Sequence, residues 1–137
     1  MTRPDTLNAW HDLVDAADPA GLDEMLAEDA TFRSPAVHTP QQGKRATKAY
    51  LSAALAVLGP TLSYRHEWWD ESSAVLEFTA EVGDKTVHGV DLIEWNAEGR
   101  ITGFTVMVRP LKGLTALMEP MAEQLEQLEQ QAERSRG

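Results

Sequence analysis

The sequence predicts an α+β fold with helices in its first half, an antiparallel sheet after them, and an extra helix at the C-terminus. Apolar residues recur at helical spacing up to Leu58, whereas alternating runs broken by short turns fill residues 61–109. Spacings of three and four residues return from Leu114 onward. Because the helices come first and do not alternate with the strands, this order indicates α+β architecture and not repeated β-α-β units.

The composition is typical of one globular domain. At 137 residues the chain is long enough to form its own core, so we expect a single domain over residues 1–137. With 22 acidic and 12 basic residues the net charge is −10, which disfavours nucleic acid and anionic membranes as partners. The N-terminus shows no secretory signal and no cysteine is present, so we expect a cytoplasmic protein.

Local signals place the elements of the first half. Thr6 can cap the first helix, and a proline suits the first position of the second. Ser34-Pro35 ends a short strand, and Gly59-Pro60 ends the third helix. The expected elements are a helix over Thr6–Ala17, a short helix from Asp18-Pro19, a strand over Asp29–Arg33, a loop over Ala36–Lys44 and a helix over Ala46–Leu58.

The second half reads as a meander of four strands. Their connections are short, and the turn Asn96–Gly99 offers a glycine for a positive φ angle. Short connections between successive strands predict antiparallel pairing. The expected strands are Thr61–Trp69, Ala74–Val82, Thr86–Trp95 and Arg100–Arg109.

An apolar pattern after the strands predicts a helical tail from about residue 114 to 134. Pro120 interrupts this pattern, so the final helix is expected to start near it. The pattern spans only about two heptads, which is short for a coiled coil. The tail therefore either docks on the body of its own chain or pairs with a second copy.

One acidic residue stands on an otherwise apolar strand face. Strict alternation puts Val87, Gly89, Asp91, Ile93 and Trp95 on the same side of their strand. A buried ionised carboxylate is costly unless it is paired, so Asp91 is expected to be protonated or to have a partner. His88, His38 and backbone groups are the candidate partners. We predict that Asp91 is buried and that its pKa is raised.

Two stretches resemble a known superfamily. They are Leu26–Pro35, followed by Gly43 and a helix, and Gly89–Ile101 with its Val-Asp-Leu-Ile-Glu-Trp-Asn-Ala-Glu-Gly-Arg motif. In this order they are similar to the nuclear transport factor 2-like superfamily, which includes SnoaL-like and ketosteroid isomerase-like proteins. The resemblance implies a cone-shaped α+β barrel, in which a curved sheet wraps around the helices and a blind apolar pocket. It also implies a homodimer through the outer face of the sheet.

The ketosteroid isomerase-like pattern can be carried over at three positions. Asp91 falls where that family keeps a protonated aspartate that donates a hydrogen bond to an oxyanion. Trp10 falls where the family has a tyrosine donor, and an indole N–H can still donate. Ser34 falls at the general-base aspartate, and a serine cannot act as a base without an activator. This departure puts the family's isomerisation mechanism in doubt.

Further residues are expected around the pocket. His38 lies in the loop after Pro35, where it either reaches Asp91 as a base or is simply exposed. Arg109 either binds an anion at the rim or pairs with an acid such as Glu119. Adjacent Trp68 and Trp69 point to opposite faces, and an exposed one marks a dimer interface. The expected lining is Trp10, Phe32, Ser34, Tyr50, Ile93, Trp95, Phe104, Val106 and Val108.

Two functions are compatible with these residues. The first is a cofactor-free isomerase, cyclase or hydrolase that acts on a small hydrophobic molecule with Asp91 as acid, and with His38 as a second catalytic candidate. The alternative is a non-catalytic ligand-binding or protein-interaction module. The chain shows no metal-ligand spacing, phosphate loop, nucleophile elbow or dinucleotide fingerprint, so neither a metal nor a cofactor is expected.

Overall fold

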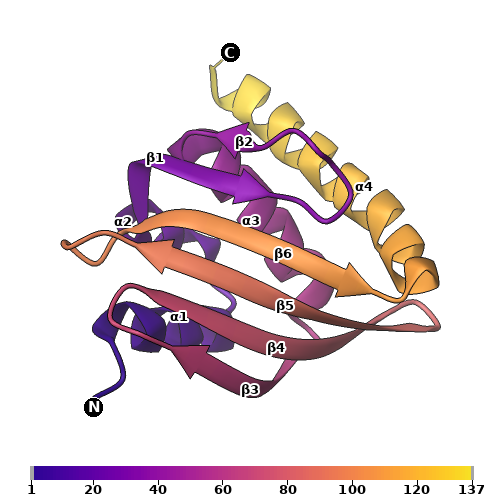
Figure 1. The fold of residues 1–137 in the computed structure, drawn as a ribbon. Coiled ribbons are helices and arrows are strands. Elements are labelled where there is room, and N and C mark those ends of the chain that lie inside the picture. The colour runs from indigo at the N-terminus through magenta and orange to yellow at the C-terminus, as the bar shows by residue number, and fades with distance from the viewer. Residues whose placement is uncertain (1, 137) are drawn as a thin grey trace.

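A computed structural model describes residues 2–136 and shows a curved six-stranded sheet with helices against its concave face (Figure 1). The first and last residues of the expected domain lie outside this range. The strand order is β2-β1-β6-β5-β4-β3. The elements are α1 (Asp5–Ala16), a 3-10 turn η1 (Pro19–Gly21), α2 (Leu22–Met25), β1 (Leu26–Arg33), β2 (Gln41–Gln42), α3 (Lys44–Leu58), β3 (Ser63–Trp69), β4 (Ser73–Val82), β5 (Lys85–Trp95), β6 (Ile101–Arg109) and α4 (Leu111–Arg136).

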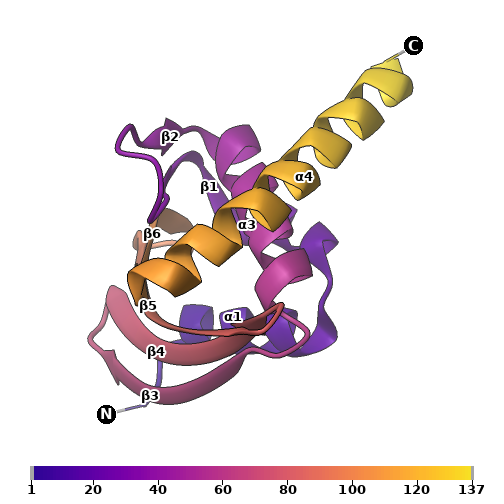
Figure 2. The same ribbon diagram turned by 90° about the vertical axis from the view of Figure 1, so that its right-hand side faces the viewer.

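The predicted α+β class and the four-stranded meander are confirmed. Strands β3 to β6 pair antiparallel in chain order, with tight connections. The sheet is curved but does not close, because β2 and β3 are its two edges; the expected barrel is therefore an open cone. In Figure 2, β3 and β4 curve around α1, and this curvature encloses the core.

The strand β1 differs from its predicted extent. It begins at Leu26, three residues earlier than expected, because Leu26 pairs with Ile101 of β6. The pairing of β1 with β6 is parallel and contains an irregularity between Leu26 and Thr31. The predicted loop after β1 contains the two-residue strand β2, which pairs back onto Thr31 and Phe32. These contacts fix β1 in the sheet next to β6.

The predicted cap at Thr6 is wrong. Helix α1 starts at Asp5 after Pro4, and no side chain caps it. The Thr6 hydroxyl instead donates to the backbone carbonyl of Gly99 over 2.8 Å. This hydrogen bond connects the start of α1 to the turn between β5 and β6. Because Thr6 is buried, the bond also gives its hydroxyl the partner that a buried polar group requires.

A single hydrophobic core lies between α1, α3 and the sheet. Burial of each large apolar side chain contributes about 1.5–3 kcal/mol. The core is tightly packed where Gly89 on β5 lies opposite Phe78 on β4. A Cβ atom at residue 89 would lie 2.8 Å from Phe78 Cζ. The largest fully buried apolar side chains are Leu7, Leu22, Leu26, Phe32, Leu51, Leu76, Phe78, Val87, Ile93, Ile101 and Phe104.

The C-terminal helix does not begin near Pro120, as the sequence had suggested. Helix α4 runs without a break from Leu111 to Arg136, with Pro120 inside it. A proline has no N–H, so the Ala116 carbonyl lacks its usual helical donor. The helix continues because side chains on both sides of the proline, Leu117 and Met121, pack against the core. The first part of α4 docks on its own chain, whereas its end projects away from the body (Figure 2).

Within residues 2–136, no helix is both long enough and apolar enough to span a bilayer.

Candidate functional site

The centre of the candidate site is the buried carboxyl group of Asp91. Its side chain lies on the inward face of β5, between Leu76 and Val106, and is only 6% exposed. Tyr64 donates its hydroxyl hydrogen to Asp91 Oδ2 over 2.6 Å. Trp10 Nε1 donates in turn to the Tyr64 hydroxyl oxygen over 3.0 Å. Three side chains from α1, β3 and β5 thus form one hydrogen-bonded chain.

Burial dominates the electrostatics of this chain. It raises the pKa of Asp91 from 3.8 to about 7, and the hydrogen bond from Tyr64 opposes this rise. Burial also raises the pKa of Tyr64 well above 10, and the nearby Asp91 carboxyl adds to that rise. Near neutral pH, Asp91 is therefore present in both its protonated and its ionised form, whereas Tyr64 stays protonated.

A bulge in β3 points Tyr64 into the core. Tyr64 pairs with Phe78 and His66 pairs with Glu77, so Arg65 is an extra residue in the ladder. Strict alternation would have put Tyr64 on the same side as His66. The sequence predicts His88, His38 or a backbone group as the partner of Asp91, whereas the structure shows Tyr64 in that place.

A small inner cavity adjoins the Asp91 carboxyl. Its volume is about 30 Å³, and its walls include Trp10, Tyr64, Asp91 and Phe104. This is room for about one water molecule or one small polar atom of a ligand. Among the described residues no side chain or backbone group hydrogen-bonds to Asp91 Oδ1. This oxygen is not one of the fully enclosed polar atoms without a partner, so it is accessible and has bonding capacity left.

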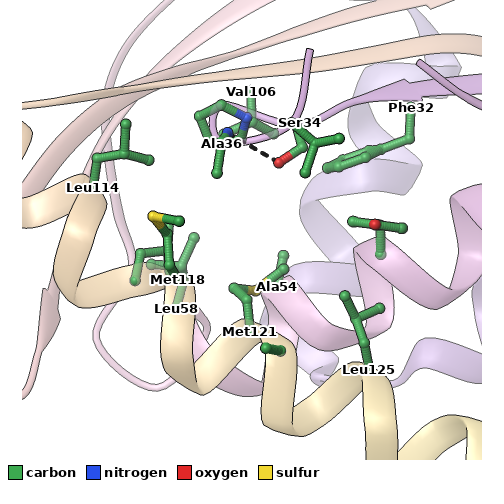
Figure 3. A pocket seen from close by; sticks show the side chains of 15 residues that line it. Phe32, Ser34, Ala36, Ala54, Leu58, Val106, Leu114, Met118, Met121 and Leu125 are labelled. Carbon is green, nitrogen blue, oxygen red and sulfur yellow. Dashed lines mark hydrogen bonds between the residues drawn. The ribbon is translucent and has the colours of Figure 1, made fainter. Parts of the chain in front are cut away.

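A larger outer cavity of about 290 Å³ lies between β1, α3 and α4 (Figure 3). Its walls carry no carboxylate and no imidazole. The Ser34 hydroxyl oxygen accepts a hydrogen bond from the Ala36 N–H over 3.1 Å, so it is engaged in its own turn. Tyr50 stacks on Phe32 with ring centroids 5.2 Å apart. The lining residues are Phe32, Ser34, Pro35, Ala36, Val37, Tyr50, Ala54, Leu58, Val106, Leu114, Leu117, Met118, Met121, Ala122 and Leu125.

The two cavities are neighbours. Ala54, Leu58 and Val106 line both of them, so the outer cavity adjoins the inner one at these side chains. Together the cavities offer a polar inner end and an apolar outer end to a ligand.

The structure brings most of the expected site residues to these cavities. Phe32, Ser34, Tyr50 and Val106 line the outer one, and Trp10, Asp91, Phe104 and Val106 line the inner one.

The structure places the other expected site residues elsewhere. Ile93, Trp95 and Val108 line neither cavity, although all three pack in or against the core. The Trp95 indole N–H donates to the Glu71 carbonyl over 3.0 Å, which is a structural role.

Two polar candidates lie away from Asp91. His38 is exposed and lines neither cavity, so the structure does not bring it together with Asp91. A loop has no periodic pattern in its sequence, so the direction of the His38 side chain was not predictable. Arg109 contacts His88 Nδ1 over 3.2 Å, and His88 contacts Glu77 over 2.8 Å; neither Glu119 nor a cavity is involved. In residues 2–136 no three His, Asp or Glu side chains gather as metal ligands.

Comparison with known proteins identifies the fold and the family. The SnoaL-like domain family matches residues 7–104, so the chain belongs to this family. A steroid delta-isomerase from Pseudomonas aeruginosa is 40% identical and superposes with a TM-score of 0.84, over 90% of each chain. A protein with a cystatin-like fold from Silicibacter pomeroyi is 30% identical with a TM-score of 0.80, over 87% of this chain and 84% of the other. No curated protein matches this chain significantly in sequence.

More distant structures show the fold alone. The epoxide hydrolase/cyclase-like enzyme SalBIII, which has a role in pyran ring formation in salinomycin, is 19% identical with a TM-score of 0.63. It matches 79% of this chain and 90% of its own. The fold is thus the NTF2-like one, and it carries different activities in different members.

Proposed function

We propose that this protein binds a small hydrophobic molecule in the two cavities and holds one oxygen atom of that molecule with Asp91. The observation that carries the proposal is the position of Asp91. Its side chain is buried, its Oδ2 accepts a hydrogen bond from Tyr64, and no hydrogen bond from the described residues reaches its Oδ1. A buried group with unused bonding capacity beside a cavity is suited to a ligand.

The chemistry available to Asp91 is that of an acid. Its protonated form can donate a hydrogen bond or a proton to a carbonyl, hydroxyl or epoxide oxygen. A pKa of about 7 is well matched to proton transfer near neutral pH. The hydrogen bonds from Trp10 through Tyr64 orient the carboxyl and keep its second oxygen available. No metal or cofactor is needed for such a step.

The reaction that follows is a cofactor-free isomerisation, cyclisation or hydrolysis. Among these, the 40% identity to a steroid delta-isomerase favours isomerisation. The outer cavity contributes no base, because Ser34 stands where a carboxylate would be required and its hydroxyl is engaged by Ala36. In an isomerisation Asp91 would therefore donate its proton to the substrate oxygen and, as the carboxylate, accept the proton released from carbon; the same two transfers in reverse at the second carbon would restore both groups.

The direct test is a thermal-shift screen followed by an assay for turnover. Wild type and Asp91→Asn are compared against steroids, aromatic polyketides, terpenoid epoxides and fatty acids. We expect one class to raise the wild-type melting temperature and to lose its effect in the variant. A Δ5-3-ketosteroid is then assayed through the ultraviolet absorbance of its conjugated product. The absence of any shift with folded protein would overturn the proposal.

A non-catalytic binding protein is the second candidate. It is favoured by the loss of the base at Ser34, which removes half of an acid–base pair without closing the cavity. A ligand that binds the wild type without being converted, and that loses its binding in Asp91→Asn, would identify this function.

We also propose that the protein forms a homodimer through the outer face of the sheet. Trp68 and Met107 on this face are 59% and 53% exposed, which is unusual for large apolar side chains. Glu77, His66 and His88 lie beside them on the same face. A face that carries both acidic and basic groups can be complementary to itself across a two-fold axis.

A further inference from the structure

Much of the wall of the outer cavity comes from a helix beyond the residues that the family model matches. The SnoaL-like match ends at residue 104, whereas α4 begins at Leu111. Six lining residues come from α4, namely Leu114, Leu117, Met118, Met121, Ala122 and Leu125 (Figure 3). Two chains with the same core and the same buried aspartate can therefore differ here in the ligand that they accept.

This wall is entirely apolar and partly adaptable. The six side chains include no hydrogen-bonding group except the weakly accepting sulfur of methionine. Met118 and Met121 are unbranched, so they can adjust to ligands of different width. The facing walls carry only the Ser34 and Tyr50 hydroxyls as polar side-chain groups, and the Ser34 hydroxyl already accepts a hydrogen bond from Ala36.

The rim of this cavity exposes apolar side chains to water. Met118 on α4 is 50% exposed, and Val37 on the loop after β1 is 40% exposed; both line the outer cavity. Exposed large apolar side chains at a cavity rim mark a place where an apolar molecule gains contact. Both side chains therefore stand at the open side of the outer cavity, between α4 and the loop after β1.

Together these observations indicate which class of ligand binds and which part of the protein selects it. We infer that α4 sets the length of the ligand: an elongated molecule with a single oxygen at its inner end, held by Asp91, and an unsubstituted apolar body that ends against Met121. This inference rests on the proposed function, because it needs a ligand in the same two cavities. The inference goes beyond the proposed function because it assigns the choice of ligand to a helix outside the residues that the family model matches.

A series of linear ketones tests the inference. Alkan-2-ones from octan-2-one to tetradecan-2-one carry one oxygen near one end and differ only in apolar length. We expect the affinity of the wild type, measured by isothermal titration calorimetry, to rise about three- to fourfold per methylene until the outer cavity is filled. Beyond that length the affinity should level off.

Two variants of α4 should move the length at which the affinity levels off. Met121→Trp fills the outer end of the cavity, so long ketones should lose affinity at least tenfold while octan-2-one is little affected. Ala122→Leu adds less bulk at a more exposed position and should act in the same direction, which keeps the test decisive if the tryptophan variant does not fold. Gln127→Trp, on the same helix but outside the lining, is the matched control and should leave the length profile unchanged.

The outcomes separate the inference from the proposed function. Asp91→Asn should weaken all ketones by a similar factor, since it acts at the oxygen. If Asp91→Asn weakens binding but both α4 variants keep the wild-type length profile, the proposed function stands and the role of α4 is overturned. If no ketone binds to the folded wild type, the ligand class is overturned together with the proposed function for such molecules.

Discussion

Tyr64 and Asp91 share a hydrogen bond of 2.6 Å inside the cone, and the phenol is its donor. The Tyr64 oxygen accepts from Trp10, so its single hydrogen is directed to the aspartate. The protonated form of Asp91 can then carry its hydrogen on the oxygen that Tyr64 does not contact. This arrangement gives the buried carboxyl a defined orientation whichever charge it carries.

The raised pKa of Asp91 makes stability depend on pH. The folded value of about 7 lies above the usual 3.8, so the folded protein binds a proton more tightly than the unfolded chain does. The contribution of this group to the free energy of unfolding is fully present below pH ~4 and falls as the pH rises to ~7. At ~1.4 kcal/mol for each pH unit the loss is roughly 4 kcal/mol.

Asp91→Asn should remove this pH dependence. Asparagine has nearly the same shape and stays neutral, and its carbonyl oxygen can accept from Tyr64. At pH 8 we expect the variant to be as stable as the wild type or more stable, by urea denaturation. At pH 4 the two should be similar. A variant that is strongly destabilised at pH 8 would mean that the wild-type carboxylate is ionised and well paired.

Tyr64→Phe should destabilise the protein and raise the pKa of Asp91 further. The variant leaves the Trp10 N–H without an acceptor and Asp91 Oδ2 without a donor, which costs about 1–3 kcal/mol. Because the Tyr64 hydrogen bond lowers the pKa of Asp91, its loss should move the carboxyl titration upward in a ¹³C NMR experiment.

The matched control deletes the other hydroxyl in the site. Tyr50→Phe removes a group that lines the outer cavity and does not contact Asp91, so the Asp91 titration should stay in place. An unchanged titration in Tyr64→Phe would show that this phenol does not donate to Asp91 in solution.

The elements with strong periodic signals were predictable from the sequence. Alternation along β5 placed Asp91 on the buried face, and its burial and raised pKa are confirmed. The same rule does not predict the direction of Tyr64, because one extra residue in β3 reverses the faces. Bulges depend on pairing with the neighbouring strand, and the sequence of β3 alone does not encode them.

Loops and the last helix show two further limits. The direction of His38 depends on how its loop is held, for which no pattern exists. Pro120 predicts the start of a helix because proline breaks local hydrogen bonding, yet α4 continues through it because Leu117 and Met121 pack against the core. The α4 wall of the outer cavity was not predictable from the sequence for the same reason, since it forms only when that helix packs against the rest of the chain.

Gly89→Ala should be more destabilising than its backbone conformation suggests. The added methyl group would lie 2.8 Å from Phe78 Cζ and would also meet the Met107 carbonyl, which cannot move aside easily. We expect a loss of about 3 kcal/mol, at the upper end of the range for overpacking. Gly83→Ala is the control. A methyl group there would enter open space, so only the positive φ of 60° is unfavourable, and we expect a loss of stability of about 1 kcal/mol. Equal losses by urea denaturation would contradict the packing argument.

Pro120→Ala should stabilise the protein. The new N–H restores a donor for the Ala116 carbonyl inside a continuous helix, and a proline in this position costs about 3 kcal/mol relative to alanine. We expect a gain of about 1–3 kcal/mol in urea denaturation. Glu119→Ala, an exposed neighbour, should change stability by no more than ~0.5 kcal/mol. A loss of stability in Pro120→Ala would mean that the packing of α4 requires the local bend at the proline.

Trp68→Arg should convert the proposed homodimer into a monomer. Trp68 lies on the edge strand β3, at one end of a row of cross-strand pairs that continues through Val75 and Leu92, so a two-fold interface that covers this face as far as β3 would bury the indole. A guanidinium placed there would lose its hydration in the interface without gaining an ion pair, which is unfavourable. Light scattering at matched concentrations should show about half the wild-type mass.

The control for this variant adds the same charge elsewhere. Gln127→Arg on the exposed side of α4 should keep the wild-type mass, because it changes the net charge without touching the sheet. Retained folding of Trp68→Arg is expected, since the indole is 59% exposed in the single chain and little core packing is lost. A wild type that is monomeric at all concentrations would overturn the dimer. A Trp68→Arg protein that stays dimeric would move the interface away from this face, and the projecting end of α4 would then be the surface to test.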